Sequence, residues 1–101
     1  MKAIVVEGPG IYRMKEVPRP AVTQPDDVLI KVKAVGICGS DLHLLHGANS
    51  AASYPRIPGH EITGEVVEVG PAVTEWKPGD RVIAEPLRYC GKCHACRRER
   101  R

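Results

Sequence analysis

The chain has 101 residues, of which 43% are hydrophobic, and a formal net charge of +3. This length allows one domain at most, and the hydrophobic content excludes an intrinsically disordered chain. The small positive charge does not by itself indicate nucleic-acid binding, and no apolar stretch approaches the length of a membrane span. Because the sequence contains no Phe, we expect a small domain with an aliphatic core.

The first part of the sequence predicts a β-hairpin. Residues 2–7 (KAIVVE) are rich in β-branched side chains and precede the turn residues 8–10 (GPG), which predicts a strand and a tight turn. Residues 12–17 predict a second strand, antiparallel to the first, which Pro18 and Pro20 end. A proline-rich connector follows.

The middle of the sequence predicts a strand and then a helix. Residues 28–35 (VLIKVKAV) alternate between apolar and charged side chains, which is typical of a half-buried strand. Residues 40–46 predict a short helix, because Ser40 can cap its N-terminus, Asp41 suits the positive end of the helix dipole, and Gly47 can end it.

Two further strands are predicted at residues 62–69 and 81–84, with glycine- and proline-rich turns around them. Four or five short strands with one short helix indicate a mainly β fold, either a barrel or a sandwich.

Three cysteines, Cys90, Cys93 and Cys96, form a Cys-x2-Cys-x2-Cys motif near the end of the sequence. Thiolates at this spacing can surround one metal ion, and sulfur ligands select zinc or an iron–sulfur centre. A closed structural zinc site takes four ligands, so we expect that the chain is cut inside a metal loop. We therefore predict an ordered barrel over residues 1–84 and a frayed, partly ligated end beyond it, with residues 90–101 as the interrupted loop.

Clustered metal-binding thiols also indicate a reducing compartment, and the first residues lead directly into a strand rather than a secretory signal. We therefore expect a cytoplasmic protein. The arginines that follow the triplet predict a solvated tail more readily than a polyanion contact.

A second group of candidate ligands lies at predicted strand ends. Cys38 directly follows one strand, and His60 and Glu61 directly precede another. A β fold can bring such ends together, and two or three protein ligands with an open position are the coordination of a catalytic zinc. Taken alone, Cys38 could be an inert core thiol and His60 a structural histidine.

Three neighbours of Cys38 could support such a site. Asp41 can accept the free imidazole N–H of His60 and fix its tautomer. Ser40 and His43 could pass a proton outward from a zinc-bound oxygen. Helix capping explains Ser40 equally well, Asp41 could simply complement the helix end, and His43 could be an ordinary exposed residue.

Five motifs follow one another in the sequence: VGICGSDLH at 35–43, GHE at 59–61, GEVVEVG at 64–70, PGDRV at 78–82, and the cysteine triplet. Together they resemble the N-terminal catalytic domain of zinc-dependent medium-chain alcohol and polyol dehydrogenases. The resemblance covers essentially the whole chain.

This resemblance implies a GroES-like, partly open β-barrel, of which residues 1–101 would be the N-terminal part. In the family this domain is joined to a Rossmann domain that binds NAD or NADP and that is absent from this sequence. The family's fourth structural cysteine would come after Arg101. The implied site residues are Cys38, His60 and Glu61 for catalytic zinc, Cys90, Cys93 and Cys96 for structural zinc, Asp41 beside His60, and Ser40 and His43 in a proton relay.

The leading hypothesis is thus an enzyme part that takes hydride from a secondary alcohol or polyol to NAD(P), in a full-length protein expected to form a homo-oligomer without nucleic-acid or membrane partners. The chain alone is not expected to turn over. One alternative is a zinc-binding or nucleic-acid-binding module of the zinc-ribbon kind that uses the triplet and its arginines. Another is a non-catalytic barrel of the co-chaperonin type, which would not require Cys38, His60 and Glu61 together.

Overall fold

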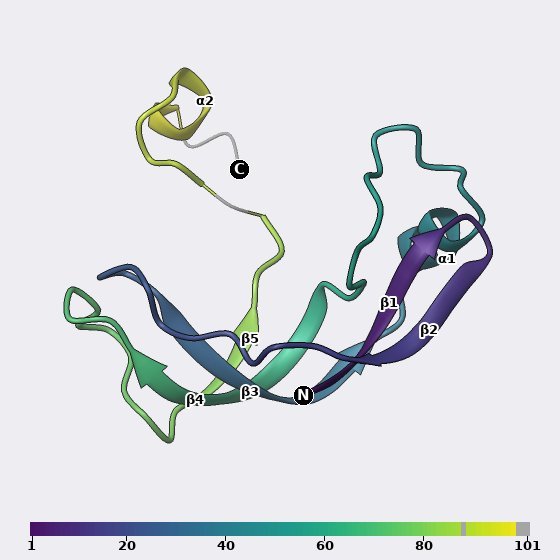
Figure 1. Ribbon diagram of the computed structural model, residues 1–101. Helices are drawn as coiled ribbons and strands as arrows, with labels where there is room; N and C mark the ends of the chain where they lie inside the picture. The colour runs from purple at the N-terminus through teal and green to yellow at the C-terminus, as the bar shows by residue number, and fades with distance from the viewer. Residues whose placement is uncertain (88, 99–101) are drawn as a thin grey trace.

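The computed structural model describes residues 1–87 and 89–98. Its described part is mainly β, with two antiparallel sheets in the strand orders β1–β2 and β3–β4–β5 (Figure 1). The elements in chain order are β1 (Lys2–Gly8), β2 (Ile11–Glu16), β3 (Val28–Gly36), α1 (Gly39–Leu45), β4 (Glu61–Val69), β5 (Arg81–Ala84) and α2 (His94–Arg97). The mainly β architecture predicted from the sequence is confirmed, and its sheets are open.

The first sheet is the predicted hairpin. Gly10, with a φ of 72°, lets the chain turn tightly between β1 and β2, and the strands pair in the register Val6↔Tyr12. One strand is buried and the other is not: Val5 and Val6 are 8% and 0% exposed, whereas every residue of β2 is exposed.

The second sheet has β4 at its centre, between β3 and β5. Val66 of β4 is 1% exposed. The half-buried alternation predicted for β3 is not observed. Residues 28–30 are all half-buried and residues 31–35 are all exposed, with Val32 at 49%, and the register shifts between Val32 and Ala34. This β-bulge, with Lys33 as the extra residue, interrupts the regular pairing of β3 with β4.

Helix α1 begins one residue before the predicted range, and Ser40 is not its cap. The N-cap is Cys38, and the carboxylate of Asp41 accepts a hydrogen bond of 2.9 Å from the backbone N–H of Cys38. Ser40 instead lies in the first turn, where its hydroxyl is free to face another group. Gly47 ends the helix as predicted, with a φ of 72°.

Helix α1 is attached to the first sheet. Leu44, its buried residue, is 6% exposed, and the backbone N–H of Gly10 donates to the carbonyl of Leu45 at 2.6 Å. The loop after the helix adds a bridge between Val6 and Arg56. Consequently the segment between β3 and β4 contacts the hairpin through both α1 and Arg56.

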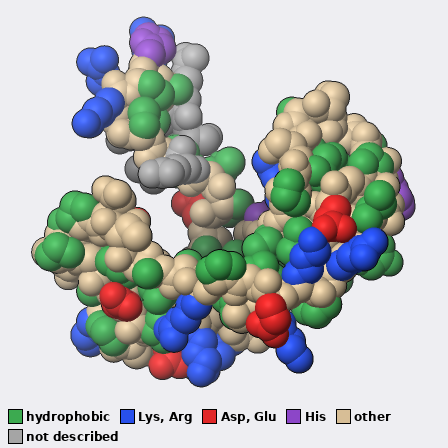
Figure 2. Space-filling model, viewed as in Figure 1, with side chains coloured by type: hydrophobic (Ala, Val, Ile, Leu, Met, Phe, Trp, Pro, Cys, Tyr) green, Lys and Arg blue, Asp and Glu red, His purple; other side chains and the backbone are tan. Residues whose placement is uncertain are grey.

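After β5 the chain leads away from both sheets to α2 (Figure 1). This single turn was not predicted, because it carries no apolar periodicity that would indicate a helix. Figure 2 shows the surface hollowed between the part around α2 and the part formed by β1, β2 and α1. Among the described residues, no helix is long and apolar enough to cross a membrane.

Candidate metal centres

The first candidate centre forms where β3 ends and β4 begins. Gly36 and Glu61 are partners in the antiparallel ladder, so the residues just beyond them, Cys38 and His60, are brought to one place. The potential ligand atoms of Cys38, His60 and Glu61 all lie within 4.8 Å of one another. The strand ends thus meet as the sequence predicts, while the role of these residues as zinc ligands stays a prediction.

Asp41 and Ser40, both on α1, contact the imidazole of His60 from opposite nitrogen atoms. Asp41 Oδ1 lies 3.5 Å from His60 Nδ1, and Ser40 Oγ lies 3.4 Å from His60 Nε2. A carboxylate that holds Nδ1 leaves Nε2 as the nitrogen that can face an ion. This arrangement fits the predicted positioning role of Asp41.

His43 is not drawn into this group. It is exposed on α1, and within the described part of the chain no hydrogen bond joins it to Ser40. The predicted relay from Ser40 to His43 therefore has its first member beside His60 and its second at the protein surface.

The electrostatics of the first centre favour the metal-binding form of its cysteine. The backbone N–H of Ser40, followed by its hydroxyl and by His60, lowers the pKa of the Cys38 thiol. The hydrogen bond with Cys38, supported by the charge of Asp41, raises the pKa of His60. Since thiolate is the form that binds metals, the surroundings of Cys38 suit a zinc ligand, and an incoming cation would replace the proton of His60.

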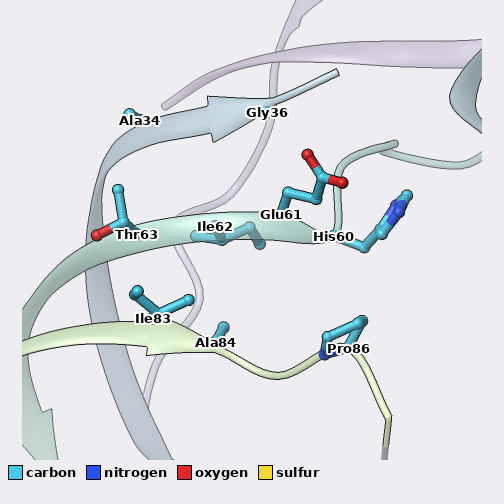
Figure 3. A pocket seen from close by; sticks show the side chains of 9 residues that line it. All are labelled: Ala34, Gly36, His60, Glu61, Ile62, Thr63, Ile83, Ala84 and Pro86. Atoms are coloured by element: carbon cyan, nitrogen blue, oxygen red, sulfur yellow. The ribbon is translucent and has the colours of Figure 1, made fainter. Parts of the chain in front are cut away.

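An apolar hollow lies next to this centre (Figure 3). It has a volume of about 490 Å³ and reaches from His60 and Glu61 along the sheet. Its other lining residues are Ala34, Gly36, Ile62, Thr63, Ile83, Ala84 and Pro86. Sequence reasoning missed this wall. These lining residues come together because β5 pairs with β4, the strand that begins at Glu61, and this pairing places Ala84 opposite Ile62. Recognising that pairing from the sequence would have revealed the hollow.

The second candidate centre is the cysteine triplet. Cys96 Sγ lies 3.8 Å from Cys90 Sγ and 3.4 Å from Cys93 Sγ. Sulfur atoms bound tetrahedrally to zinc at about 2.3 Å are about 3.8 Å apart, so the three thiols fit a zinc ion. His94, which also lies in this loop, is exposed and outside the group.

Backbone N–H groups also favour the thiolate form of a cysteine in this centre, which is the form that binds a cation. The N–H groups of Lys92 and Cys93 point at the sulfur of Cys90 and lower the pKa of its thiol to about 7. The loop that approaches the triplet thus stabilises a thiolate before any ion is bound. The frayed end that we predicted beyond residue 84 stays a prediction, and Arg100 and Arg101 of the basic tail lie outside the described residues.

Comparison with known proteins identifies a family. The family model described as "Alcohol dehydrogenase GroES-like domain" matches residues 24–101. Among curated relatives, L-threonine 3-dehydrogenase from Streptomyces avermitilis is 48% identical over 106 residues, an alignment that covers 100% of this chain and 30% of the relative.

Solved structures agree with this. Galactitol-1-phosphate dehydrogenase from Escherichia coli superposes with a TM-score of 0.91 at 37% identity, over 97% of this chain and 28% of that one. A zinc-binding dehydrogenase from Sinorhizobium meliloti, bound to NADP, gives a TM-score of 0.87 at 43% identity, over 98% of this chain and 28% of that one. The chain thus spans less than a third of the length of these relatives, and it belongs to the alcohol dehydrogenase GroES-like domain family.

Proposed function

We propose that this chain is the zinc-binding part of the catalytic domain of a dehydrogenase that moves hydride from a small secondary alcohol or polyol to NAD or NADP. The observation that carries the proposal is the grouping of Cys38, His60 and Glu61 at the edge of an apolar hollow. Soft and borderline ligands with room for one more group are typical of catalytic zinc, and an apolar wall can hold the carbon skeleton of a small substrate.

The names of the relatives support an alcohol or polyol substrate. They include sorbitol dehydrogenase from Bacillus subtilis and galactitol-1-phosphate dehydrogenase from Escherichia coli, both named for polyol or polyol-phosphate substrates. One solved neighbour is bound to NADP and another is complexed with NADH, which supports a nicotinamide cofactor. No Gly-x-Gly-x-x-Gly fingerprint occurs in the sequence, so we place cofactor binding outside residues 1–101.

Each residue of the first centre then has a defined task. Cys38 and His60 would hold the zinc ion, with Glu61 as a constant or intermittent third ligand. Bound there, zinc would supply Lewis acidity toward an alcohol oxygen. Asp41 holds the imidazole in one orientation through Nδ1. Ser40 lies beside His60 Nε2, where its hydroxyl can accept a proton from the substrate oxygen and release it toward the exposed His43.

The triplet is assigned a structural role in this proposal. Cys90, Cys93 and Cys96 would hold a second zinc ion, with a fourth ligand from outside the described residues. Their unpaired thiols suit a reducing, cytoplasmic compartment. A homo-oligomeric assembly of the whole protein stays a prediction.

The alternatives are less well supported. A zinc ribbon needs two knuckles on one ion, whereas Cys38 groups with His60 and Glu61, apart from the triplet. A co-chaperonin-like barrel would need no such group, yet the described structure assembles it. Both alternatives also lack a counterpart in the dehydrogenase names of the relatives reported above.

Zinc stoichiometry tests the proposal. We expect the chain to bind two zinc ions and to lose one in Cys38→Ala and the other in Cys93→Ala, as measured by elemental analysis after gel filtration. The two variants control for each other, because they remove the same atom from different centres. Unchanged zinc content in Cys38→Ala would show that the first centre does not bind metal. In the whole protein, alcohol-dependent reduction of NAD(P) should then disappear in the same variant.

A further inference from the structure

Gly36 is the cross-strand partner of Glu61, one of the candidate ligands. The pair forms the end of the β3–β4 ladder, and side chains of directly opposite residues lie on the same face of a sheet. A residue at position 36 with a side chain would therefore share its space with the side chain of Glu61.

That space is already filled. A Cβ atom built on Gly36 would overlap Oε2 of Glu61 and would lie only 3.0 Å from its Cβ and 3.3 Å from its Cδ. Figure 3 shows the side chain of Glu61 rising from β4 toward the end of β3 at Gly36. The carboxylate thus occupies the volume that an alanine side chain would take.

Backbone conformation does not explain this glycine. Gly36 lies within a strand and is absent from the glycines with positive φ, which in the described residues are Gly10, Gly47, Gly59, Gly79 and Gly91. An alanine could adopt its backbone angles. What distinguishes the position is the missing side chain, because it leaves room for the carboxylate of its partner.

We propose that Gly36 is the positioning residue that allows the side chain of Glu61 to lie against the end of β3 and join Cys38 and His60. Cys38 lies two residues beyond Gly36, and the side chain of Glu61 that fills the space at Gly36 also places a carboxylate oxygen within 4.8 Å of the ligand atoms of Cys38 and His60. The effect on zinc rests on the proposed function, whereas the effect on the orientation of Glu61 does not.

Four variants test this inference. Gly36→Ala fills the space, Glu61→Ala removes the carboxylate, and the double variant combines the two changes. Gly39→Ala is the matched control, because it makes the same substitution next to Cys38 where nothing lies within 4 Å of the added Cβ. Zinc affinity is measured by competition with a chromophoric chelator, and contacts between the α-protons at position 36 and the side chain of Glu61 are measured by NMR on the metal-free chain.

We expect Gly36→Ala and Glu61→Ala each to weaken zinc binding at the first centre by at least about tenfold. In the Glu61→Ala background, Gly36→Ala should have no further effect beyond about twofold, because the two changes act on the same contact. Gly39→Ala should retain wild-type affinity. In the metal-free chain, the NMR contacts between position 36 and Glu61 should be present in the wild type and in Gly39→Ala and weakened in Gly36→Ala.

The outcomes separate the inference from the proposed function. A tenfold loss for Gly36→Ala that persists in the Glu61→Ala background would overturn the inference, since position 36 would then act through another residue. Absence of the NMR contacts in the wild type would also overturn it. If those contacts appear as expected but Cys38→Ala leaves zinc binding unchanged, Gly36 still positions Glu61 and it is the proposed zinc site that fails.

Discussion

The carboxylate of Asp41 lies 3.5 Å from the imidazole Nδ1 of His60, at the contact between α1 and the residue that precedes β4. Its second oxygen accepts the backbone N–H of Cys38 at 2.9 Å. One side chain thus holds both a candidate ligand and the backbone of another, and only 13% of it is exposed. We expect the spacing of the first centre to depend on this bridge.

Asp41→Asn should therefore weaken zinc binding by about 10–100-fold without preventing folding, because the uncharged amide holds the His60 tautomer less firmly. The measurement is zinc competition against a chelator, with circular dichroism as the check on folding. Asp26→Asn, at an exposed position of the connector, is the matched control and should bind zinc normally. Equal affinity in both variants would exclude the bridge as a determinant of metal binding.

Alkylation of Cys90 in the metal-free chain should depend on pH in a way that differs from that of an ordinary thiol. Backbone N–H groups lower its pKa to about 7, so the reactive thiolate is abundant above that pH and disappears below it. The rate with iodoacetamide, followed by peptide mass spectrometry, should rise to half its maximum near pH 7 rather than at the value of about 8.5 typical of cysteine. Added zinc should protect the thiol, and a midpoint at the ordinary value would contradict the prediction.

Asp80 should make folding sensitive to acid. The backbone N–H of Lys77 donates to its carboxylate at 3.0 Å, and this bond lowers the pKa of Asp80 below its ordinary value. A carboxyl group with a lowered folded-state pKa stabilises the fold above its unfolded pKa, and this contribution is lost as the pH falls through the folded value.

Asp80→Asn should accordingly be less stable than the wild type at neutral pH, and the difference should shrink as the pH falls below about 4. Urea unfolding of the metal-free chain at a series of pH values gives this comparison. The exposed Asp26 again supplies the control substitution. A difference between wild type and Asp80→Asn that stays constant with pH would show that the Lys77 hydrogen bond is not its cause.

Tyr54→Phe should lower the free energy of unfolding by about 0.5–1.5 kcal/mol. The Tyr54 hydroxyl donates to the carbonyl of Leu44 at 2.7 Å and so ties the loop to α1. Tyr12→Phe removes the same atom from a side chain that is 62% exposed and should change stability little. Urea unfolding of the two variants tests the prediction, which a similar loss in both would contradict.

The parts of the fold that local chemistry determines were predictable. β-Branched runs and Gly-Pro turns located the strands, and the positions of Cys38 and His60 at strand ends indicated that a β fold can bring them together. The helix cap was predicted wrongly, because a serine near a helix start is a strong local signal, while the actual cap depends on the hydrogen bond from Cys38 to Asp41. Whether Cys38 or Ser40 caps the helix depends on the residue at which the chain leaves β3.

Other features depend on contacts that sequence periodicity does not encode. The bulge at Lys33 interrupts an alternation that looked regular, and the hollow beside His60 needs Ile83 and Pro86 from a strand and loop distant in sequence. The space above Gly36 is likewise visible only once β3 and β4 are paired. In each case the decisive neighbour comes from another element.

The two sheets share no strand, and the segment from 37 to 60 leaves β3, packs on the hairpin through α1 and Arg56, and returns to β4. The first candidate centre lies at the base of this excursion, with Cys38 at its start and His60 at its end. An ion bound by both Cys38 and His60 would cross-link the two ends of this segment and reduce the conformational entropy of its unfolded conformations. The hairpin contacts that segment, so it would then unfold together with the second sheet instead of detaching first. Metal content would thus determine how cooperatively the chain unfolds.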